Sequence, residues 1–287
     1  MQSVKWKELL KKEFEERIAA NPVVYLPMGL CEPHGHIAAL GLDIIKAEYL
    51  CEEAASRWGG VVAPTQGYQI HEVGYHATWL ADVVGNVNAY MTSIPTGPML
   101  YFFLYQLRAF YNAGFNHAIV ITGHAGGNQH DFRVAGKIFM QKTDMTVSVF
   151  SDPELTSGKY KGDHAGKYEI SQLLYLRPDL VDLSRINGWE KNDPESRFAQ
   201  GEDISEANAA YGKLVIETCL TGIHHAMLFD RTGQQKITKR SLLPLVFIEE
   251  LWRELKNKEL ITVTNSDEQL QIDVQSIWEP SAHYFIP

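Results

Sequence analysis

The stretch GLCEPHGHIAALGLD, Gly29 to Asp43, holds side chains that can bind a divalent metal ion. Glu32 and His34 are two residues apart, and Asp43 follows nine residues after His34. Carboxylate oxygens and imidazole nitrogens are common ligands of zinc, manganese and iron. A Glu-x-His pair alone is weak evidence, because such pairs also occur on ordinary surfaces.

A second cluster is TGHAGGN, residues 122–128, which places His124 beside Gly126 and Gly127. Glycine allows the backbone to approach a ligand closely and to adopt positive φ angles. A turn of this composition is often only a turn, so its interpretation depends on the other clusters.

The third cluster is GDHAGKYEIS, residues 162–171, with Asp163, His164 and Glu169. Asp163 precedes a predicted helix and has an alternative role as a helix cap that accepts backbone N–H bonds. Three clusters of this kind in one chain indicate a metal site more strongly than any one of them.

Regular structure must position these clusters. Four apolar segments, one of them shorter than the others, are expected to be strands. Helices are expected where apolar residues recur with helical spacing. The expected strands are 23–28, 59–65, 117–124 and 145–150, and the expected helices are 4–20, 44–58, 98–113, 128–141, 207–220 and 242–256. Residues 67–96 and 184–205 are expected to be loops.

Alternating strands and helices predict an α/β fold with three layers, α/β/α, around a mostly parallel sheet. In such sheets ligands bind beyond the carboxyl ends of the strands. Because the clusters at 29–43 and 122–128 begin at such strand ends, their side chains are expected to lie together.

The composition excludes several function classes. The chain has 287 residues and a formal net charge of −9, which disfavours binding to nucleic acid or to an anionic membrane. Its three cysteines form no C-x-x-C pair, as is typical of a reducing cytoplasm. The charged N-terminal segment differs from a signal peptide, and no apolar run of about 18 residues predicts a membrane span. A cytoplasmic location is therefore expected.

Taken together, the three motifs resemble those of the creatininase (creatinine amidohydrolase) family. That family's motifs resemble G-S-x-E-Q-H-G-P-H-L-P-x-x-T-D, N-G-H-G-G-N and H-A-G-x-x-E-T-S. The similarity covers roughly residues 5–180 and implies a single domain over residues 1–287, with a family-variable extension from about residue 184. It also implies a homo-oligomer, often a hexamer.

The resemblance implies two divalent metal ions, zinc, manganese or iron. Glu32, Asp43 and His124 would hold one ion, and His34, Asp43 and Glu169 the other, with Asp43 bridging the two. One branch of the family takes a carboxylate from a position that is glycine here, which makes Glu169 the expected ligand.

The resemblance further implies roles in catalysis. His164 would move a proton to the leaving group, and Asp163 would orient His164 or bind substrate. The backbone amides of Gly126 and Gly127 would support a developing oxyanion.

The sequence departs from the family between the first two motifs. A family segment like F-P-G-T is replaced by GYQIHEVGYHATWLADVVGNVNAY, whose His71, His76 and Trp79 are expected to contact the substrate. The first hypothesis is a metal-dependent hydrolase that opens a small cyclic substrate at a C–N amide bond. A second is a C–C hydrolase of a cyclic polyol diketone of the 3-dehydro-scyllo-inosose type, from inositol catabolism. A third is a metal-binding or sugar-binding protein without catalysis.

Overall fold

The main sheet has four parallel strands. The computed structural model describes residues 3–188, 190, 192–230, 240–264 and 275–278. The strands are β1 (Val23–Met28), β2 (Val61–Val62), β5 (His117–Thr122) and β6 (Thr146–Ser151), in the order β2-β1-β5-β6. A separate parallel pair consists of β3 (Gln69–Ile70) and β4 (Ser93–Ile94).

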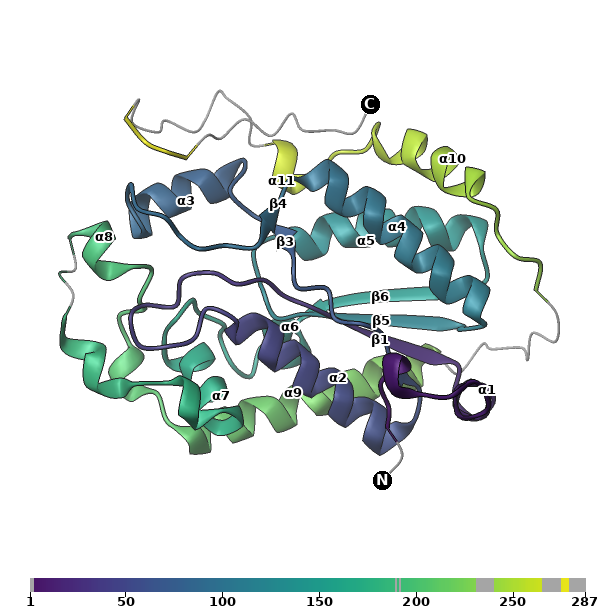
Figure 1. The fold of residues 1–287 in the computed structure, drawn as a ribbon, viewed down its shortest axis with the longest axis horizontal. Helices are drawn as coiled ribbons and strands as arrows, with labels where there is room; N and C mark the ends of the chain where they lie inside the picture. The colour runs from purple at the N-terminus through teal and green to yellow at the C-terminus, as the bar shows by residue number, and fades with distance from the viewer. Residues whose placement is uncertain (1–2, 189, 191, 231–239, 265–274, 279–287) are drawn as a thin grey trace.

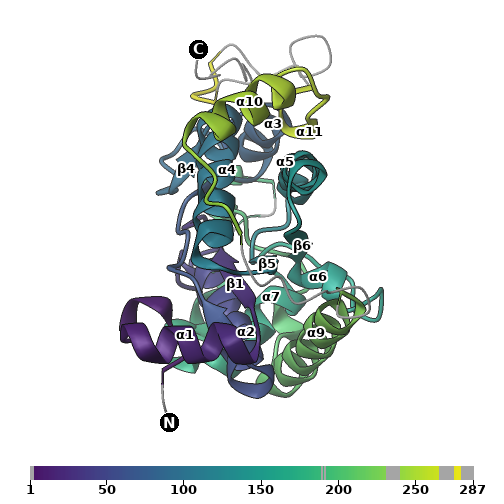
Figure 2. The same cartoon turned by 90° about the vertical axis from the view of Figure 1, so that its right-hand side faces the viewer.

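Helices cover both faces of this sheet, as Figures 1 and 2 show. One face carries α4 (Thr96–Ala113) and α5 (Asn128–Lys142), with α10 (Val246–Leu255) packed on them, and the other carries α2 (Leu42–Trp58), α7 (Lys167–Leu176) and α9 (Ala209–Asp230). Successive strand side chains point to opposite faces. Val24 and Leu26 of β1 therefore join one core, and Val23 and Tyr25 join the other. The predicted three-layer α/β/α architecture is confirmed.

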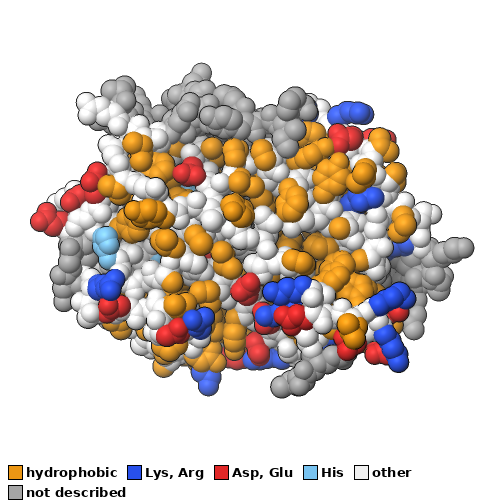
Figure 3. Space-filling view, viewed as in Figure 1, with side chains coloured by type: hydrophobic (Ala, Val, Ile, Leu, Met, Phe, Trp, Pro, Cys, Tyr) orange, Lys and Arg blue, Asp and Glu red, His pale blue; other side chains and the backbone are white. Residues whose placement is uncertain are grey.

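The remaining elements are short or peripheral. They are η1 (Trp6–Glu8), α1 (Lys11–Ala20), α3 (Tyr75–Val83), α6 (Asp152–Leu155), η2 (Pro178–Leu180), η3 (Leu183–Gly188), α8 (Pro194–Arg197), η4 (Ile204–Glu206) and α11 (Ile261–Thr264), where η marks a 3-10 helix. Within the described ranges, every helix is too short or too polar to cross a membrane. On the face in Figure 3, apolar side chains are spread over much of the surface, and acidic and basic ones mix along the lower edge.

Some predicted elements have different boundaries. The expected helix at 4–20 is interrupted, because Leu10 is extended and its backbone N–H donates to Glu13 Oε2 at 2.9 Å, which caps α1. The expected strand at 59–65 pairs only at Val61–Val62. The expected loop at 67–96 contains α3, β3 and β4, elements too short to produce a visible periodicity.

The strand register brings the functional segments to one edge. Met28 of β1 pairs with Thr122 of β5, which pairs with Ser151 of β6, so three strands end side by side. The chain leaves β1 toward β2 on one side, and β5 lies on the other side. This reversal between β1 and β5 opens the crevice in which α/β proteins bind ligands.

Helix α9 packs closely on the middle of α7 through Gly212. A Cβ atom at Gly212 would overlap the Ser171 carbonyl group. By contrast, Gly41 has a φ of −87° and open space where a Cβ would stand.

We expect Gly212→Ala to lower the free energy of unfolding by about 2 kcal/mol, because the helices must separate to admit the methyl group. The Gly41→Ala variant should cost less, about 1 kcal/mol at most, because it meets no atoms and only weakens the N-cap of α2. Denaturant unfolding of both variants measures the difference. Equal stability of the two would contradict this account of the α7–α9 contact.

Candidate metal centre

Glu32 and His34 lie in the loop that follows β1, and both side chains are buried. The Glu32 backbone N–H donates to the Leu40 carbonyl at 3.0 Å, which fixes the loop. His34 Nδ1 lies 3.0 Å from the Glu32 carbonyl oxygen and donates its proton to it. His34 Nε2 is thereby turned inward, 3.7 Å from Asp43 Oδ1 and 3.5 Å from Glu169 Oε2.

Asp43 stands in the first turn of α2 and is fully buried. Its Oδ1 faces His34 Nε2 at 3.7 Å, and its Oδ2 faces His124 Nδ1 at 3.7 Å. The backbone of Gly123 packs against Asp43 so closely that a Cβ there would overlap the Asp43 carbonyl. The two oxygens of one carboxylate therefore point to two different histidines, as a bridging ligand requires.

The described residues contain two clusters of ligand atoms that meet at Asp43. Glu32, Asp43 and His124 form one, and His34, Asp43 and Glu169 form the other, with the ligand atoms of each within 4.8 Å of one another. His124 follows β5, and its Nδ1 lies 2.9 Å from Glu32 Oε1. The five residues predicted as ligands thus lie together, in the two sets that the sequence resemblance implies.

Several of these buried atoms find no hydrogen-bond partner among the described residues. They are Glu32 Oε2, His34 Nε2, both carboxylate oxygens of Asp43, and His124 Nε2. Leaving buried polar atoms unsatisfied is costly, so a concentration of them at one place needs an explanation. Carboxylate oxygens and imidazole nitrogens suit a divalent ion, and the chain therefore has residues positioned for metal binding.

The charges of the cluster shift the pKa values of its members. Burial alone would lower the pKa of His124, but the neighbouring Glu32 and Asp43 carboxylates raise it to about 10. Burial also acts to lower the pKa of His34, but the Asp43 and Glu169 carboxylates outweigh burial and raise it well above the ordinary value. The pKa of Asp43 lies well below its ordinary value because Lys46 and the two histidines overcome the effect of burial. Without metal, protonated imidazoles balance the carboxylates.

Lys46 is a member of this network that sequence reasoning missed. It is buried on α2, and its Nζ lies 2.6 Å from Glu169 Oε1, 3.3 Å from Asp152 Oδ1 and 3.6 Å from Asp43 Oδ1. The three carboxylates raise its pKa well above the ordinary value although burial opposes this. Asp43 and Lys46 are three residues apart on α2, which begins at Leu42, whereas the predicted helix began at residue 44 and left Asp43 outside it.

His164 faces the same cluster from the segment before α7. Its Nε2 lies 2.8 Å from the Pro33 carbonyl oxygen and donates to it, which leaves Nδ1 free to accept a proton. Nδ1 lies 3.9 Å from both Glu32 Oε1 and Glu169 Oε2. The Trp79 ring meets the His164 ring edge-on at 4.7 Å. His164 is thus aimed at the carboxylates.

Asp163 accepts hydrogen bonds at the start of α7. The backbone N–H groups of Tyr168, Glu169 and Gly166 donate to its carboxylate at 2.6, 3.2 and 3.3 Å. His164 is oriented by the hydrogen bond that its Nε2 donates to the Pro33 carbonyl, whereas Asp163 holds the turn that carries Glu169. The helix-cap role considered from the sequence accounts for these contacts, and Asp163 also lines the adjoining pocket.

A pocket of about 180 Å³ opens beside the two clusters. Its lining residues are Glu32, His71, Tyr75, His76, Trp79, His124, Ala125, Gly126, Asp163, His164 and Glu169. It includes four of the five predicted substrate contacts. The fifth, Gly127, begins α5 with a φ of +76° and packs on Tyr75, whose hydroxyl lies 2.5 Å from the position of a Cβ. Tyr75 and Ala125 are lining residues that the sequence did not indicate.

Of the four histidines that line the pocket, His71 and His76 have strongly lowered pKa values and are therefore neutral at pH 7. Burial and the neighbouring His124 lower the pKa of His76 to about 3, and its Nε2 donates to the Gly126 carbonyl at 3.0 Å. Burial, with His76 and His124, lowers the pKa of His71 well below its usual value. A Cβ at Gly126 would lie 2.7 Å from His76 Nε2 and 2.8 Å from His124 Nε2, so only glycine fits between these rings.

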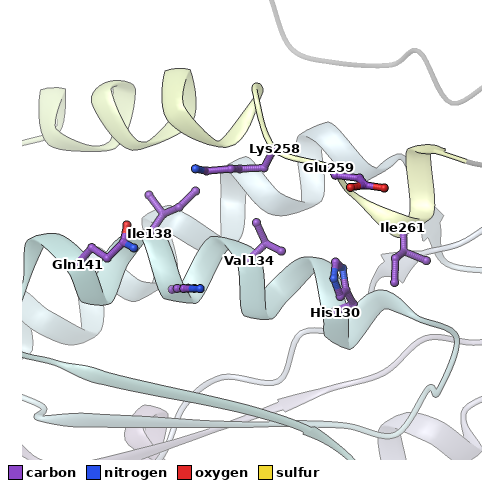
Figure 4. A pocket seen from close by; sticks show the side chains of 8 residues that line it. His130, Val134, Ile138, Gln141, Lys258, Glu259 and Ile261 are labelled. Atoms are coloured by element: carbon purple, nitrogen blue, oxygen red, sulfur yellow. The ribbon is translucent and has the colours of Figure 1, made fainter.

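A larger groove of about 520 Å³ lies between α5 and the chain around α11 (Figure 4). Its lining residues are His130, Val134, Lys137, Ile138, Gln141, Lys258, Glu259 and Ile261. None of the predicted site residues is among them, so the smaller pocket is the one that adjoins the chemistry.

Comparisons with known proteins identify the family of the chain. The model of the creatininase family, described as creatinine amidohydrolase, matches residues 7–226. A creatinine amidohydrolase from Pseudomonas putida is 27% identical over 251 residues, which are 77% of this chain and 94% of that protein. The family match extends past residue 184, where the sequence had suggested a variable extension.

Solved structures give the same result. A crystal structure of a creatinine amidohydrolase superposes with a TM-score of 0.66 at 23% identity, covering 82% of this chain and all of that one. A creatininase structure named for Mn has a TM-score of 0.65 at 25% identity, and the match covers 79% of this chain and 98% of that one. A mutant creatininase of Zn–Zn type has a TM-score of 0.63 at 25% identity, and the match covers 80% of this chain and 99% of that one. With the family match over more than half its length, the chain belongs to the creatininase family of hydrolases.

Proposed function

We propose that this chain is a hydrolase with two divalent metal ions that opens a small cyclic amide at its C–N bond. The observation that carries the proposal is the pair of ligand clusters that share Asp43 and face His164 across one small pocket. Solved creatininases named for Mn and for Zn–Zn, and a mutant creatininase complexed with creatine, support both the ions and the substrate class.

The clusters divide the work between two ions. Glu32, Asp43 and His124 would hold one ion, and His34, Asp43 and Glu169 the other. Bound divalent ions supply Lewis acidity to a carbonyl oxygen and lower the pKa of a water molecule. The donor set of carboxylates and imidazoles is compatible with zinc, manganese or iron.

His164 is the proposed proton carrier. With Nε2 held by the Pro33 carbonyl, Nδ1 takes the proton from the attacking water and delivers it to the departing nitrogen. Asp163 acts indirectly in this scheme, because its carboxylate holds the turn that presents His164 and Glu169.

The pocket suits a small uncharged ring. Its volume of about 180 Å³ is below that of sites for drug-sized ligands. Trp79 offers a ring face or edge, and neutral His71 and His76 are polar walls without charge. The backbone amide of Gly126, which lines the pocket and whose carbonyl accepts a hydrogen bond from His76, is the proposed support for an oxyanion. The homo-oligomer expected from the family stays a prediction.

Asp43→Ala should remove the shared ligand. Wild-type protein should carry about two divalent ions per chain, and the variant should lose most of both, because each cluster depends on this carboxylate. Plasma mass spectrometry of purified protein measures the content. The exposed Asp179→Ala variant, which breaks a surface pair with Arg177, should keep the wild-type content. Wild-type protein that holds no metal, even after added Zn²⁺ or Mn²⁺, would contradict the proposal.

Metal binding should release protons. At pH 7 the metal-free protein holds His34 and His124 protonated, since both pKa values are raised, the latter to about 10. A histidine binds metal as a neutral imidazole, so about two protons should leave per chain. Metal affinity should therefore increase with pH until the pH exceeds the pKa values of both histidines. Titration calorimetry in buffers of different ionisation enthalpy counts the protons. Identical heats in all buffers at pH 7 would rule out the protonated pair.

His164→Ala should keep its metal and lose activity. Hydrolysis of the best cyclic amide should fall about 100-fold or more, because the proton carrier is gone. The exposed His225→Ala variant should retain wild-type rates. A panel of lactams, creatinine included, and cyclic diketones identifies the substrate first, by ring opening followed with mass spectrometry.

The panel separates the alternatives. Turnover of cyclic diketones alone would replace the C–N assignment with C–C hydrolysis. Loss of metal together with activity in His164→Ala would make His164 a ligand and not a proton carrier. Full activity in that variant would remove it from the mechanism.

A further inference from the structure

Lys46 is a buried cation that the proposed reaction does not use. Its side chain is 1% exposed, and neither it nor Asp152 lines the pocket. It therefore touches no substrate, and its place must be explained by the groups that it contacts. These are the carboxylates of Glu169, Asp152 and Asp43.

The two carboxylate oxygens of Glu169 have different partners, and Lys46 binds one of them. Its Nζ donates to Oε1 at 2.6 Å. Oε2 accepts the Ala165 backbone N–H at 2.9 Å and lies 3.5 Å from His34 Nε2, on the side of the second ligand cluster. Because the ammonium occupies Oε1, only Oε2 is presented to that cluster.

Asp152 holds Lys46 from behind. It follows β6, and its Oδ1 lies 3.3 Å from Nζ while its Oδ2 accepts a hydrogen bond from Gln172 Nε2 at 3.1 Å. Lys46 and Asp43 come from one face of α2, three residues apart, so the same helix sets the bridging carboxylate and the cation beside it. The Lys46 ammonium group is therefore held between the carboxylates of Asp152 and Glu169.

We propose that Lys46 is a positioning residue that restricts Glu169 to ligation through one oxygen. A carboxylate that binds through both oxygens fills two coordination positions, and catalytic metal sites need one open position for water or substrate. The inference rests on the proposed metal-dependent function. It concerns the coordination of the second cluster and adds nothing to the choice of substrate.

Lys46→Met tests the proposal, because methionine keeps the length of the side chain without its charge. We expect cobalt to load to wild-type content, since removal of a positive charge favours cation binding. The visible absorption of bound Co²⁺ should weaken as Glu169 adds its second oxygen and the coordination number rises. The kcat should fall about 10–100-fold, as for other residues that orient ligands, with KM little changed.

Two further variants make the test decisive. Lys46→Met with Asp152→Asn removes the unpaired rear carboxylate and should restore stability but not the cobalt spectrum or kcat. Lys5→Met, which breaks the surface pair with Glu52, is the matched control and should leave all three readouts unchanged. If the single variant fails to fold, the double variant carries the measurement.

The outcomes separate this proposal from the function on which it rests. A wild-type spectrum and kcat in the folded variants would overturn the positioning role and leave Lys46 as a counter-ion only. Failure of wild-type protein to bind cobalt would overturn the metal centre itself. Cobalt binding without hydrolysis of any cyclic amide would reject only the substrate class, and the spectrum would still decide the role of Lys46.

Discussion

The structure depends on one constraint, which is that four carboxylates are buried at the edge of the sheet. Asp43 and Asp152 are fully buried, and Glu32 and Glu169 nearly so. Ionised groups cannot stay in such a place without partners, because their desolvation is costly. Two raised-pKa histidines and Lys46 supply the positive charge within the chain. The unsatisfied oxygens of Asp43 show that this compensation is incomplete among the described residues, and a divalent ion would complete it.

The fold makes this concentration of charge possible. Glu32, His124 and Asp152 follow three adjacent strands that end in register. The backbone alone therefore places these residues close together, whatever rotamers their side chains adopt. Asp43 is added from α2 and Glu169 from α7, both packed on the same face of the sheet. Gly123, which follows β5, packs directly against the Asp43 backbone and so fixes the start of α2 against the end of that strand. Rigid elements therefore set the positions of the ligands.

Much of this could be predicted from the sequence. Apolar runs predicted β1, β5 and β6, because buried parallel strands are largely apolar. Two of the clusters begin where predicted strands end, which indicated that they lie at one edge of the sheet. The ligand sets needed the family resemblance, since spacing alone cannot say that residues 34 and 169 meet. Lys46 was missed because a lone lysine in a helix usually faces solvent. The helix α3 was missed because, at nine residues, it is too short to show a clear periodicity.

The pocket extends the same electrostatic argument to the substrate. Burial that raises the cost of charge on His71 and His76 keeps both neutral, beside clusters whose own histidines are driven to the charged form by carboxylates. None of the lining residues is Lys or Arg, so apart from the proposed metal ligand His124 an anionic ligand would find no cationic side chain on these walls. A neutral ring amide, the proposed substrate, would need no such cation when it enters, and it would develop negative charge only at its carbonyl oxygen during the proposed reaction. Interactions that strengthen at that point accelerate the reaction, whereas a pocket already lined with positive side chains would bind ground-state anions instead.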